Sequence, residues 1–538
     1  MSLPKKQKAV QLIGINELKL NEGKDVFIPN DYQVLAQVQA VGLCFSDLKL
    51  LKQFTSHVRK SDVVSGADKS VLAEIPSYVP NGKPTVPGHE AVVKITAVGK
   101  KVQNVKVGQR FLIQADYRWL KTANSNGAFG YNFEGALQQY VLVDSRVIVS
   151  PDGQSTFIPA TDKLSASAVA LVEPWACVEQ AYAVKERTIL KKDGRMLIVS
   201  YEPIDRKQID AFTKQFGRPA EITFVLKKES LPTDKCFDDV IYLGSKAETV
   251  ETLFSKVAAN GLFNIVLCGG KFNRKVSTQV GRVHYGNIRI IGTTGNDPAE
   301  AMSHIPATAE IRKQDKINVI GAGGPMGVMH VVRNVCQGIE NTTVYAGDLD
   351  DVRLAALEKT AKPLADKNKV GLKFYNPSKS APQVKFDYFV VMAPVPKLVA
   401  AAVDDSAERG IINIFAGIPA AVNAEIDLNA YIEKHLYFIG TSGSTIDDMI
   451  AVLKKVEAGT LDTNISVGAI CGIENAIDGI KAVEAQSISG KIIVYPSCEN
   501  LPLTKLENLK DIRPDAAKAL DNGLWCKQSE DILLKGNK

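Results

Sequence analysis

The chain has 538 residues, 45% of them hydrophobic and 23% charged, which indicates a globular protein of two or three domains. Its 65 basic and 59 acidic residues are interspersed and leave a net charge of only +6, which argues against a nucleic-acid-binding surface. Residues 1–8 lack an apolar secretion signal, and no apolar run approaches the ~20 residues that span a bilayer. We therefore expect a cytoplasmic protein with no membrane partner.

The eight cysteines lie far apart in the sequence and include no Cys-x-x-Cys pair. A disulfide framework or a closed four-cysteine zinc lobe is therefore not expected.

Short β-type runs fill residues 8 to about 150, for example at 33–41, 91–98 and 138–143, and glycine and proline separate them. This pattern predicts a compact, barrel-like β domain. From about residue 190, strand-like apolar runs alternate with helical stretches, which is typical of a parallel sheet with crossover helices.

The second region contains a weak internal repeat. Residues 237–265 match residues 386–414 without a gap at an offset of 149, and after one residue of slippage 291–295 matches 439–443. We interpret the repeat as two tandem copies of a Rossmann-like half. The first copy is shorter between its first strand and the matched strand, by about the length of one β-α unit.

The two copies differ at the turn that follows their first strand. In the second copy an apolar strand at 317–320 runs into a glycine-rich turn, whereas the first copy has no glycine in the corresponding turn at 200–203. Glycines there let the backbone approach a pyrophosphate at the amino end of a helix. Only the second copy is expected to bind a dinucleotide, through Gly321, Gly323, Gly324, Met326 and Gly327.

A second strand at 343–347 ends in Asp348. This acid follows the glycine-rich turn at the distance of about 20 residues where a carboxylate would hold the adenosine ribose hydroxyls. It favours NAD over NADP, and Arg353 follows it in the same motif. The glycine spacing departs from G-x-G-x-x-G by one residue. The alternative is a tight loop in a Rossmann domain that binds no nucleotide.

Three motifs before residue 180 supply zinc-ligand types: Cys44 a thiolate, His89 an imidazole and Glu173 a carboxylate. Asp47 would accept the second ring N–H of His89, and Ser46 would lie near the oxygen on the metal and carry its proton. Each residue alone has an ordinary explanation, since free cysteines are usually buried for packing. The three motifs together favour a catalytic zinc site.

These motifs resemble those of the zinc-containing medium-chain alcohol and polyol dehydrogenases, in particular the branch of sorbitol dehydrogenase and L-sorbose 1-phosphate reductase. The resemblance rests on the motifs at 42–47, 87–90, 173–174, 321–327 and 489–496. It implies Glu90 as an alternate or outer-sphere ligand. The structural-zinc lobe of many members is absent, and Leu48, Lys49 and Leu50 stand where many relatives have a histidine relay.

The resemblance implies an α/β fold with a β-rich GroES-like catalytic domain at 1–190, completed by 485–538, and a doubly wound NAD-binding Rossmann domain at 313–484. The degenerate Rossmann-like copy at 191–312 is additional to that plan.

We expect a homo-oligomeric, zinc- and NAD-dependent oxidoreductase, with NADP less favoured, that acts on a polyol, ketose or sugar phosphate. Two alternatives remain open. One is a zinc-dependent dehydrogenase of amino alcohols such as threonine, and the other is a non-catalytic binding or assembly protein on the same fold.

Overall fold

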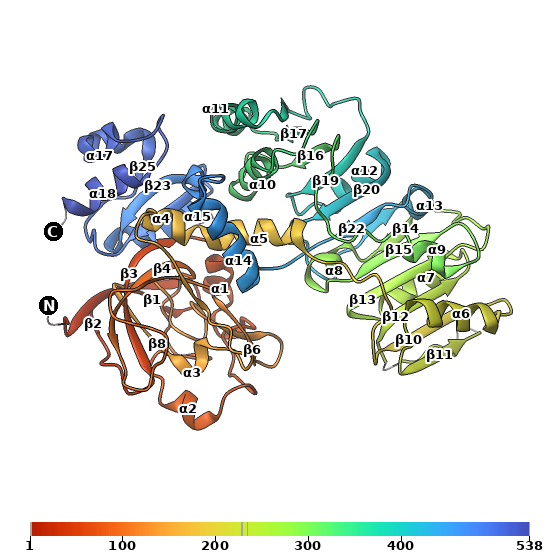
Figure 1. The fold of residues 1–538 in the computed structure, drawn as a ribbon, viewed down its shortest axis with the longest axis horizontal. Helices are drawn as coiled ribbons and strands as arrows, with labels where there is room; N and C mark the ends of the chain where they lie inside the picture. Colours follow the sequence, from red (N-terminus) through yellow and green to blue (C-terminus); the bar gives the residue numbers. More distant parts are fainter. Residues whose placement is uncertain (1–2, 227–229, 234, 537–538) are drawn as a thin grey trace. The chain divides into compact units, whose positions relative to one another are not determined.

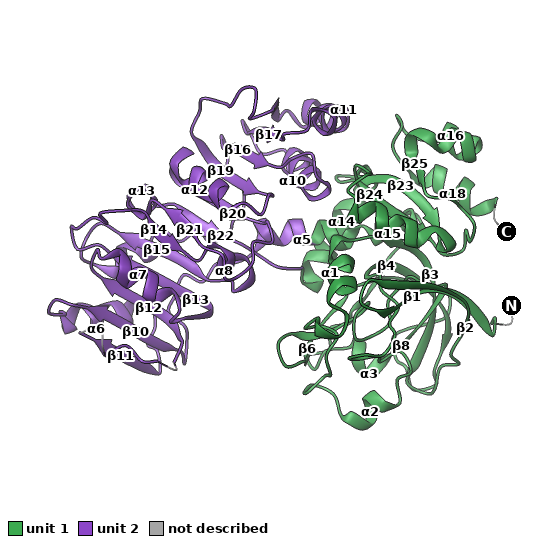
Figure 2. Cartoon of the chain, turned by 180° about the vertical axis from the view of Figure 1, so that it is seen from behind, with its two compact units in different colours: residues 1–176, 444–538 green, residues 177–443 purple. Residues whose placement is uncertain are grey.

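The computed structural model describes residues 3–226, 230–233 and 235–536, and the chain forms two compact units. Unit 1 comprises residues 1–176 and 444–538, and unit 2 comprises residues 177–443 (Figure 2). Helix α5 (Val172–Ala183) contains the first boundary between them. Among the residues described, no helix combines the length and the apolar character needed to cross a lipid bilayer.

Unit 1 is built around a mostly antiparallel sheet with the order β25-β23-β24-β3-β4-β5-β9, in which β8 also pairs with β3. Buried aliphatic and aromatic side chains fill its core, as the run of apolar residues in each strand predicts. Its strands are β1 (Lys6–Gly14), β2 (Glu17–Asp25), β3 (Gln33–Gly42), β4 (Glu90–Val98), β5 (Arg110–Ile113), β6 (Asp116–Lys121), β7 (Asn126–Ala128), β8 (Tyr140–Asp144), β9 (Phe157–Pro159), β23 (Val467–Gly472), β24 (Lys491–Tyr495) and β25 (Thr504–Lys505). Its helices are α1 (Phe45–Gln53), α2 (Lys69–Ala73), α3 (Ser145–Ile148), α4 (Ala166–Ala170), α14 (Ile446–Glu457), α15 (Ala476–Glu484), α16 (Leu509–Ile512), α17 (Pro514–Lys518) and α18 (Lys527–Lys535).

Unit 2 contains two parallel sheets with helices packed beside them (Figure 1). The first has the order β11-β10-β12-β13-β15 and the second the order β18-β17-β16-β19-β20-β22. The strands are β10 (Arg195–Ser200), β11 (Glu221–Val225), β12 (Phe237–Leu243), β13 (Val257–Val266), β14 (Val276–Thr278), β15 (Arg289–Thr293), β16 (Lys316–Ile320), β17 (Thr343–Gly347), β18 (Gly371–Tyr375), β19 (Phe386–Val391), β20 (Ser406–Ile414), β21 (Ala424–Ile426) and β22 (Tyr437–Ile439). The helices are α6 (Arg206–Phe216), α7 (Ala247–Phe254), α8 (Val280–Tyr285), α9 (Pro298–Met302), α10 (Pro325–Cys336), α11 (Asp351–Asn368), α12 (Pro396–Asp405) and α13 (Leu428–Glu433).

The elements of the two sheets follow the spacing of the sequence repeat. Strands β12 and β13 begin at positions 237 and 257, and β19 and β20 begin at 386 and 406, which reproduces the offset found in the sequence. Strands β15 and β22 begin at 289 and 437, with the same slippage by one position. The second sheet carries β18 beyond β17, whereas β11 is the edge strand of the first sheet in the described residues. The first sheet is thus one strand smaller on the side where its sequence is shorter. That the first sheet is a degenerate copy of the Rossmann-like second sheet stays a prediction.

The boundary of the β-rich unit differs from the expected one, which assigned residues 313–484 to the nucleotide domain. Residues 444–484 belong to unit 1, because β23 pairs with β24 and β25, and β24 in turn pairs with β3. The order of helix, strand and helix in this segment resembles the alternation of strands and helices in the Rossmann-like segment before it. The pattern alone therefore could not locate the change of sheet.

Candidate functional site

Cys44, His89 and Glu90 lie together in unit 1, with one potential ligand atom of each within 4.8 Å of the others. The end of β3 pairs antiparallel with the start of β4, Gly42 opposite Glu90, and this pairing brings the motif at Cys44 to the motif at His89. A Cβ on Gly42 would meet Glu90 Oε2 at 2.2 Å, so a side chain there would displace the carboxylate. The grouping follows from strand register.

Asp47 and Ser46 hold the two nitrogens of the His89 ring. Asp47 Oδ1 lies 3.1 Å from Nδ1, and Asp47 Oδ2 accepts the backbone N–H of Cys44 at 3.0 Å. Ser46 Oγ lies 3.1 Å from Nε2. Burial alone would lower the pKa of His89, but the negative charge of Asp47 and its hydrogen bond to the ring oppose burial, and the pKa is raised above its usual range.

Lys491 was not predicted as a site residue, yet its Nζ donates to Glu90 Oε1 at 2.5 Å. The Lys491 side chain is 6% exposed and that of Glu90 is fully buried. Burial lowers the pKa of Lys491, but Glu90 and Cys44 raise it more, so the ammonium stays charged. The signal in the sequence was a lysine at the start of the otherwise apolar strand β24.

Glu173 lies in α5 and is buried, but it is not a member of the set that meets within 4.8 Å. Burial raises its pKa to about 7, and the negative charge of Glu90 adds to the increase while His89 opposes it. The structure therefore places Glu90, which the sequence analysis treated as a secondary ligand, with Cys44 and His89, and leaves Glu173 outside that set.

Tyr131 is a second residue beside the cluster that the sequence did not indicate. It is buried, its ring lies 5.8 Å from the His89 ring and its hydroxyl interacts with Ser46. Burial raises its pKa, so the phenol stays protonated. The ring centroid of His57 also lies 5.1 Å from that of Tyr131, and burial and Arg59 lower the pKa of His57 to about 4.

The glycine-rich turn of unit 2 joins β16 to α10, as predicted. Gly321 adopts a φ of +85°, and a Cβ on Gly327 would meet the carbonyl oxygen of Gly321 at 2.2 Å. Gly324 is the N-cap of α10, whose first residue is Pro325. The free N–H groups of this helix end can therefore receive an anion.

Asp348 follows β17 and reaches back to the same turn, where its Oδ2 accepts the N–H of Gly323 at 2.8 Å. A Cβ on Gly323 would meet Cβ of Arg353 at 2.6 Å, so this position has no room for a side chain. Arg353 lies 3.6 Å from Asp350, the N-cap of α11. The predicted cofactor residues thus surround one turn.

The corresponding turn of the first sheet differs as the sequence suggested. It runs from Ser200 to α6 without a glycine, and the carboxylate of Asp205 caps that helix by accepting the N–H groups of Lys207 and Gln208. These donors, which a phosphate would need, are already satisfied by a negative charge.

Comparison with known proteins assigns the β-rich part of unit 1. Residues 30–152 match the alcohol dehydrogenase GroES-like domain. The chain is 30% identical over 152 residues to L-sorbose 1-phosphate reductase of Klebsiella pneumoniae and 27% identical over 235 residues to sorbitol dehydrogenase of Bacillus subtilis strain 168. These alignments cover 28% and 40% of this chain and 36% and 55% of the two relatives, so the chain spans only about half of their length or less.

Solved structures share the fold. 2R,3R-butanediol dehydrogenase from Bacillus subtilis superposes with a TM-score of 0.53 at 16% identity, over 91% of this chain and all of that one. A protein described as a short-chain alcohol dehydrogenase from E. coli CFT073, solved with NADH, gives a TM-score of 0.51 at 13% identity over 91% and 99% of the two chains. The predicted fold class, a GroES-like domain with parallel α/β sheets, is confirmed.

Proposed function

We propose, since the chain belongs to the medium-chain alcohol and polyol dehydrogenase family, that it is a zinc-dependent oxidoreductase that transfers a hydride between NAD and a polyol, ketose or sugar phosphate. The observation that carries this proposal is the meeting of Cys44, His89 and Glu90, with Asp47 on the far nitrogen of the histidine.

The donor set fits zinc. A thiolate, an imidazole and a carboxylate are ligand types of catalytic zinc sites, and a carboxylate on the second histidine nitrogen is the usual support for such a ligand. Glu90 Oε2 is buried and has no hydrogen-bond partner among the described residues, as expected of an atom that serves a cation. A bound zinc ion supplies a Lewis acid for alcohol oxidation, and NAD accepts the hydride.

The chain's own residues orient the histidine and move the proton. Asp47 accepts the Nδ1–H of His89, which leaves Nε2 as the ligand nitrogen. Ser46 Oγ, next to that nitrogen, would accept the proton of the substrate hydroxyl while it passes its own proton to the Tyr131 hydroxyl, which would release its proton toward solvent in turn. This route replaces the histidine relay that Leu48, Lys49 and Leu50 do not provide.

Glu90 is the third ligand at rest in our proposal, with Glu173 as the carboxylate that can exchange with it. The geometry supports this order, since Glu90 is in the compact set and Glu173 is not. Lys491 balances part of the negative charge when both carboxylates and the Cys44 thiolate are ionised.

The dinucleotide is assigned to the second sheet of unit 2, with its pyrophosphate at the turn from Gly321 to Gly327 and its adenosine ribose on Asp348. The solved relative with NADH supports a nicotinamide cofactor, and Asp348 favours NAD because it would repel a 2′-phosphate. The substrate class follows from the names of the two sequence relatives.

The test is metal content together with activity. Cys44→Ala and His89→Ala should each lose most of the zinc measured by elemental analysis, and should lose the reduction of NAD by a panel of polyols and sugar phosphates. Glu90→Gln should lose more zinc than Glu173→Gln. Cys268→Ala, which removes an exposed thiol of unit 2, is the matched control. Full zinc content in Cys44→Ala would remove this site from consideration, and oxidation of threonine alone would change the substrate class.

A further inference from the structure

Strands β14 and β21 join the two halves of unit 2, which we define as residues 195–302 and 316–439. They pair antiparallel, and they begin at positions 276 and 424, which are equivalent in the repeat after its slippage. In this pair Ser277 faces Glu425, its own equivalent at the same offset. Val276 faces residue 426, the equivalent of Thr278, and Thr278 faces residue 424, the equivalent of Val276. This self-complementary register is the one expected of two strands that are related by a two-fold axis through the central pair, Ser277 and Glu425.

The helices beside these strands obey the same relation. Helices α8 and α13 begin at the equivalent positions 280 and 428, and the two have the same length. A Cβ on Gly292 of β15 would meet the Ile432 side chain of α13 at 2.7 Å, and a Cβ on Gly440 would meet Cα of His284 in α8 at 2.7 Å. Gly440 and Ile432 are the equivalents of Gly292 and His284. In each half, a glycine thus packs against the equivalent helix of the other half.

The starts of the two sheets repeat one contact. The N–H of Arg195, the first residue of β10, donates to Asp238 Oδ2 at 2.9 Å, and the N–H of Lys316, the first residue of β16, donates to Asp387 Oδ2 at 2.9 Å. Asp387 is the equivalent of Asp238 in the gapless part of the repeat. The segments that lead into the two halves also bridge one another antiparallel, at residues 185 and 308.

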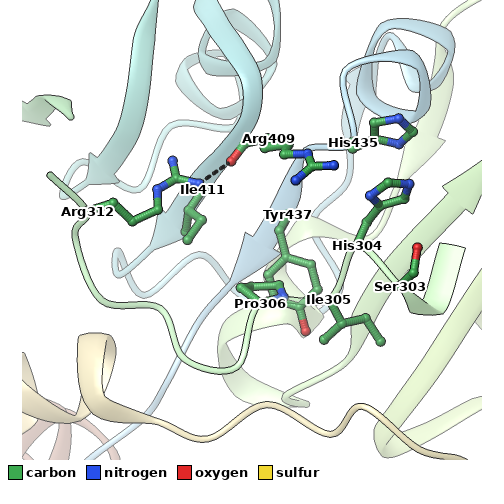
Figure 3. A pocket seen from close by; sticks show the side chains of 9 residues that line it. All are labelled: Ser303, His304, Ile305, Pro306, Arg312, Arg409, Ile411, His435 and Tyr437. Atoms are coloured by element: carbon green, nitrogen blue, oxygen red, sulfur yellow. Dashed lines mark hydrogen bonds between the residues drawn. The ribbon is translucent and has the colours of Figure 1, made fainter. Parts of the chain in front are cut away.

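Two cavities also lie at equivalent places in the two halves. A cavity of about 210 Å³ is lined in part by Arg409 and His435, whose side chains Figure 3 shows toward His304 and Tyr437. A second cavity of about 130 Å³ is lined by the equivalent residues Asn260 and Asn287. All four of these positions have φ between 51° and 60°, a left-handed conformation that asparagine tolerates better than arginine or histidine. The backbone symmetry has therefore been kept while the side chains changed.

A continuous core crosses the seam between the halves. One buried cluster contains Leu197 and Phe263 of the first half and Phe389 and Ile412 of the second. Such a contact resembles a subunit interface of the obligate kind, in which two surfaces form one core.

We propose that residues 195–302 act as a built-in partner for residues 316–439. They occupy, within the same chain, the edge through which a second copy of the dinucleotide half would otherwise pair about a two-fold axis, so the protein does not self-associate through that edge. The inference rests on the backbone of unit 2 and does not depend on the proposed reaction. It leaves the other surfaces of the chain free to take part in assembly.

The test uses cysteine pairs on the pseudo-two-fold axis. Ser277 N donates to Glu251 instead of to Glu425, so this pair is of the close, non-hydrogen-bonded type, within reach of a disulfide. Under mild oxidation the double variant Ser277→Cys/Glu425→Cys should form a disulfide within one chain. Glu425→Cys alone should give no covalent dimer. The wild type, with exposed Cys236 and Cys268, controls for native thiols.

A covalent dimer of the Glu425→Cys variant would overturn the proposal, because residue 425 would then face its counterpart in a second chain. Failure of the folded double variant to cross-link would also overturn it. Hydrogen exchange of the wild type avoids any folding defect of the variants. Amides of β14 and β21 should be equally protected from exchange at about 1 and about 100 μM protein. Protection that is lost on dilution would show that the pairing strand comes from another chain.

Discussion

Lys491 is a buried cation whose partner Glu90 is buried as well, so removal of either side chain leaves the other unpaired in the core. Replacement of Lys491 by Met should lower the free energy of unfolding of the metal-free protein by about 3–5 kcal/mol, because an unpaired carboxylate is left in the core. Urea unfolding measures the loss. Lys52→Met, which removes an exposed partner of Glu484, is the matched control and should cost at most about 1 kcal/mol. An equally small loss for Lys491→Met would contradict the buried ion pair with Glu90.

Asp348 is the single carboxylate that we assign to the cofactor's ribose. Its replacement by Ala should weaken NAD binding about tenfold to hundredfold, the value of a hydrogen bond to a charged group, and should narrow the preference for NAD over NADP. Fluorescence titrations with both reduced cofactors measure the effect. Asp366→Ala, which removes an exposed carboxylate from α11, should change neither affinity. An unchanged preference in Asp348→Ala would place the ribose elsewhere.

At the scale of the elements, the two strand-to-helix turns of unit 2 should give one dinucleotide per chain. The turn before α10 has free N–H groups, whereas Asp205 already caps α6. Calorimetry should find one site in the wild type and none in Gly323→Asp, since the new side chain meets Arg353 and adds a negative charge. Asp366→Ala, which removes an exposed carboxylate of α11, is the control and should leave the number of sites at one. Two equivalent sites in the wild type would refute this assignment.

Helix α10 carries His330, a buried neutral histidine whose Nδ1 is hydrogen-bonded to the hydroxyl of Tyr182 at 2.8 Å. Burial lowers its pKa to about 3, so between pH 6.5 and 3 the unfolded chain binds a proton that the folded chain does not. The stability contributed by His330 is therefore complete above pH 6.5 and lost as the pH falls, by about 2 kcal/mol at pH 5. Asparagine can accept the same hydrogen bond without titrating.

Urea unfolding of the wild type and of His330→Asn at pH 7 and pH 5 tests this point. The difference in unfolding free energy between the two proteins should shrink toward acid pH by about 2 kcal/mol, because all other titrating groups are shared. A pH-independent difference would show that His330 has the same pKa in the folded and the unfolded chain.

At the scale of the whole molecule, the sequence predicted the features that depend on local pattern. The β-rich beginning, the later β-α alternation and the glycine turn at Gly321 all follow from periodicity and turn chemistry. The order of the motifs was enough to predict that Cys44 and His89 lie together. What the sequence could not give depends on contacts between distant segments, such as Lys491 beside Glu90, or the transfer of residues 444–484 to the first unit's sheet.

The choice between Glu90 and Glu173 shows the same limit. Both acids belong to motifs that supply possible metal ligands. Only the register of β3 with β4 brings one of them, Glu90, into the set with Cys44. The pairing between the two halves of unit 2 could not be predicted from the sequence either. A repeat in sequence indicates that two similar folds exist, but a pairing such as that of β14 with β21 is set by packing.

The shared core of the two halves should make unit 2 unfold as one cooperative unit, although only its second half is expected to bind NAD. NAD at 100 times its dissociation constant adds about 2.7 kcal/mol to the stability of whatever unit unfolds together. Amides that exchange only by global opening should therefore slow about 100-fold in β13 as well as in β20. Hydrogen exchange followed by mass spectrometry measures both strands, with Gly323→Asp as the control that should show no change. Protection confined to residues 316–439 would mean that the first half unfolds independently and is attached to its neighbour without being coupled to it.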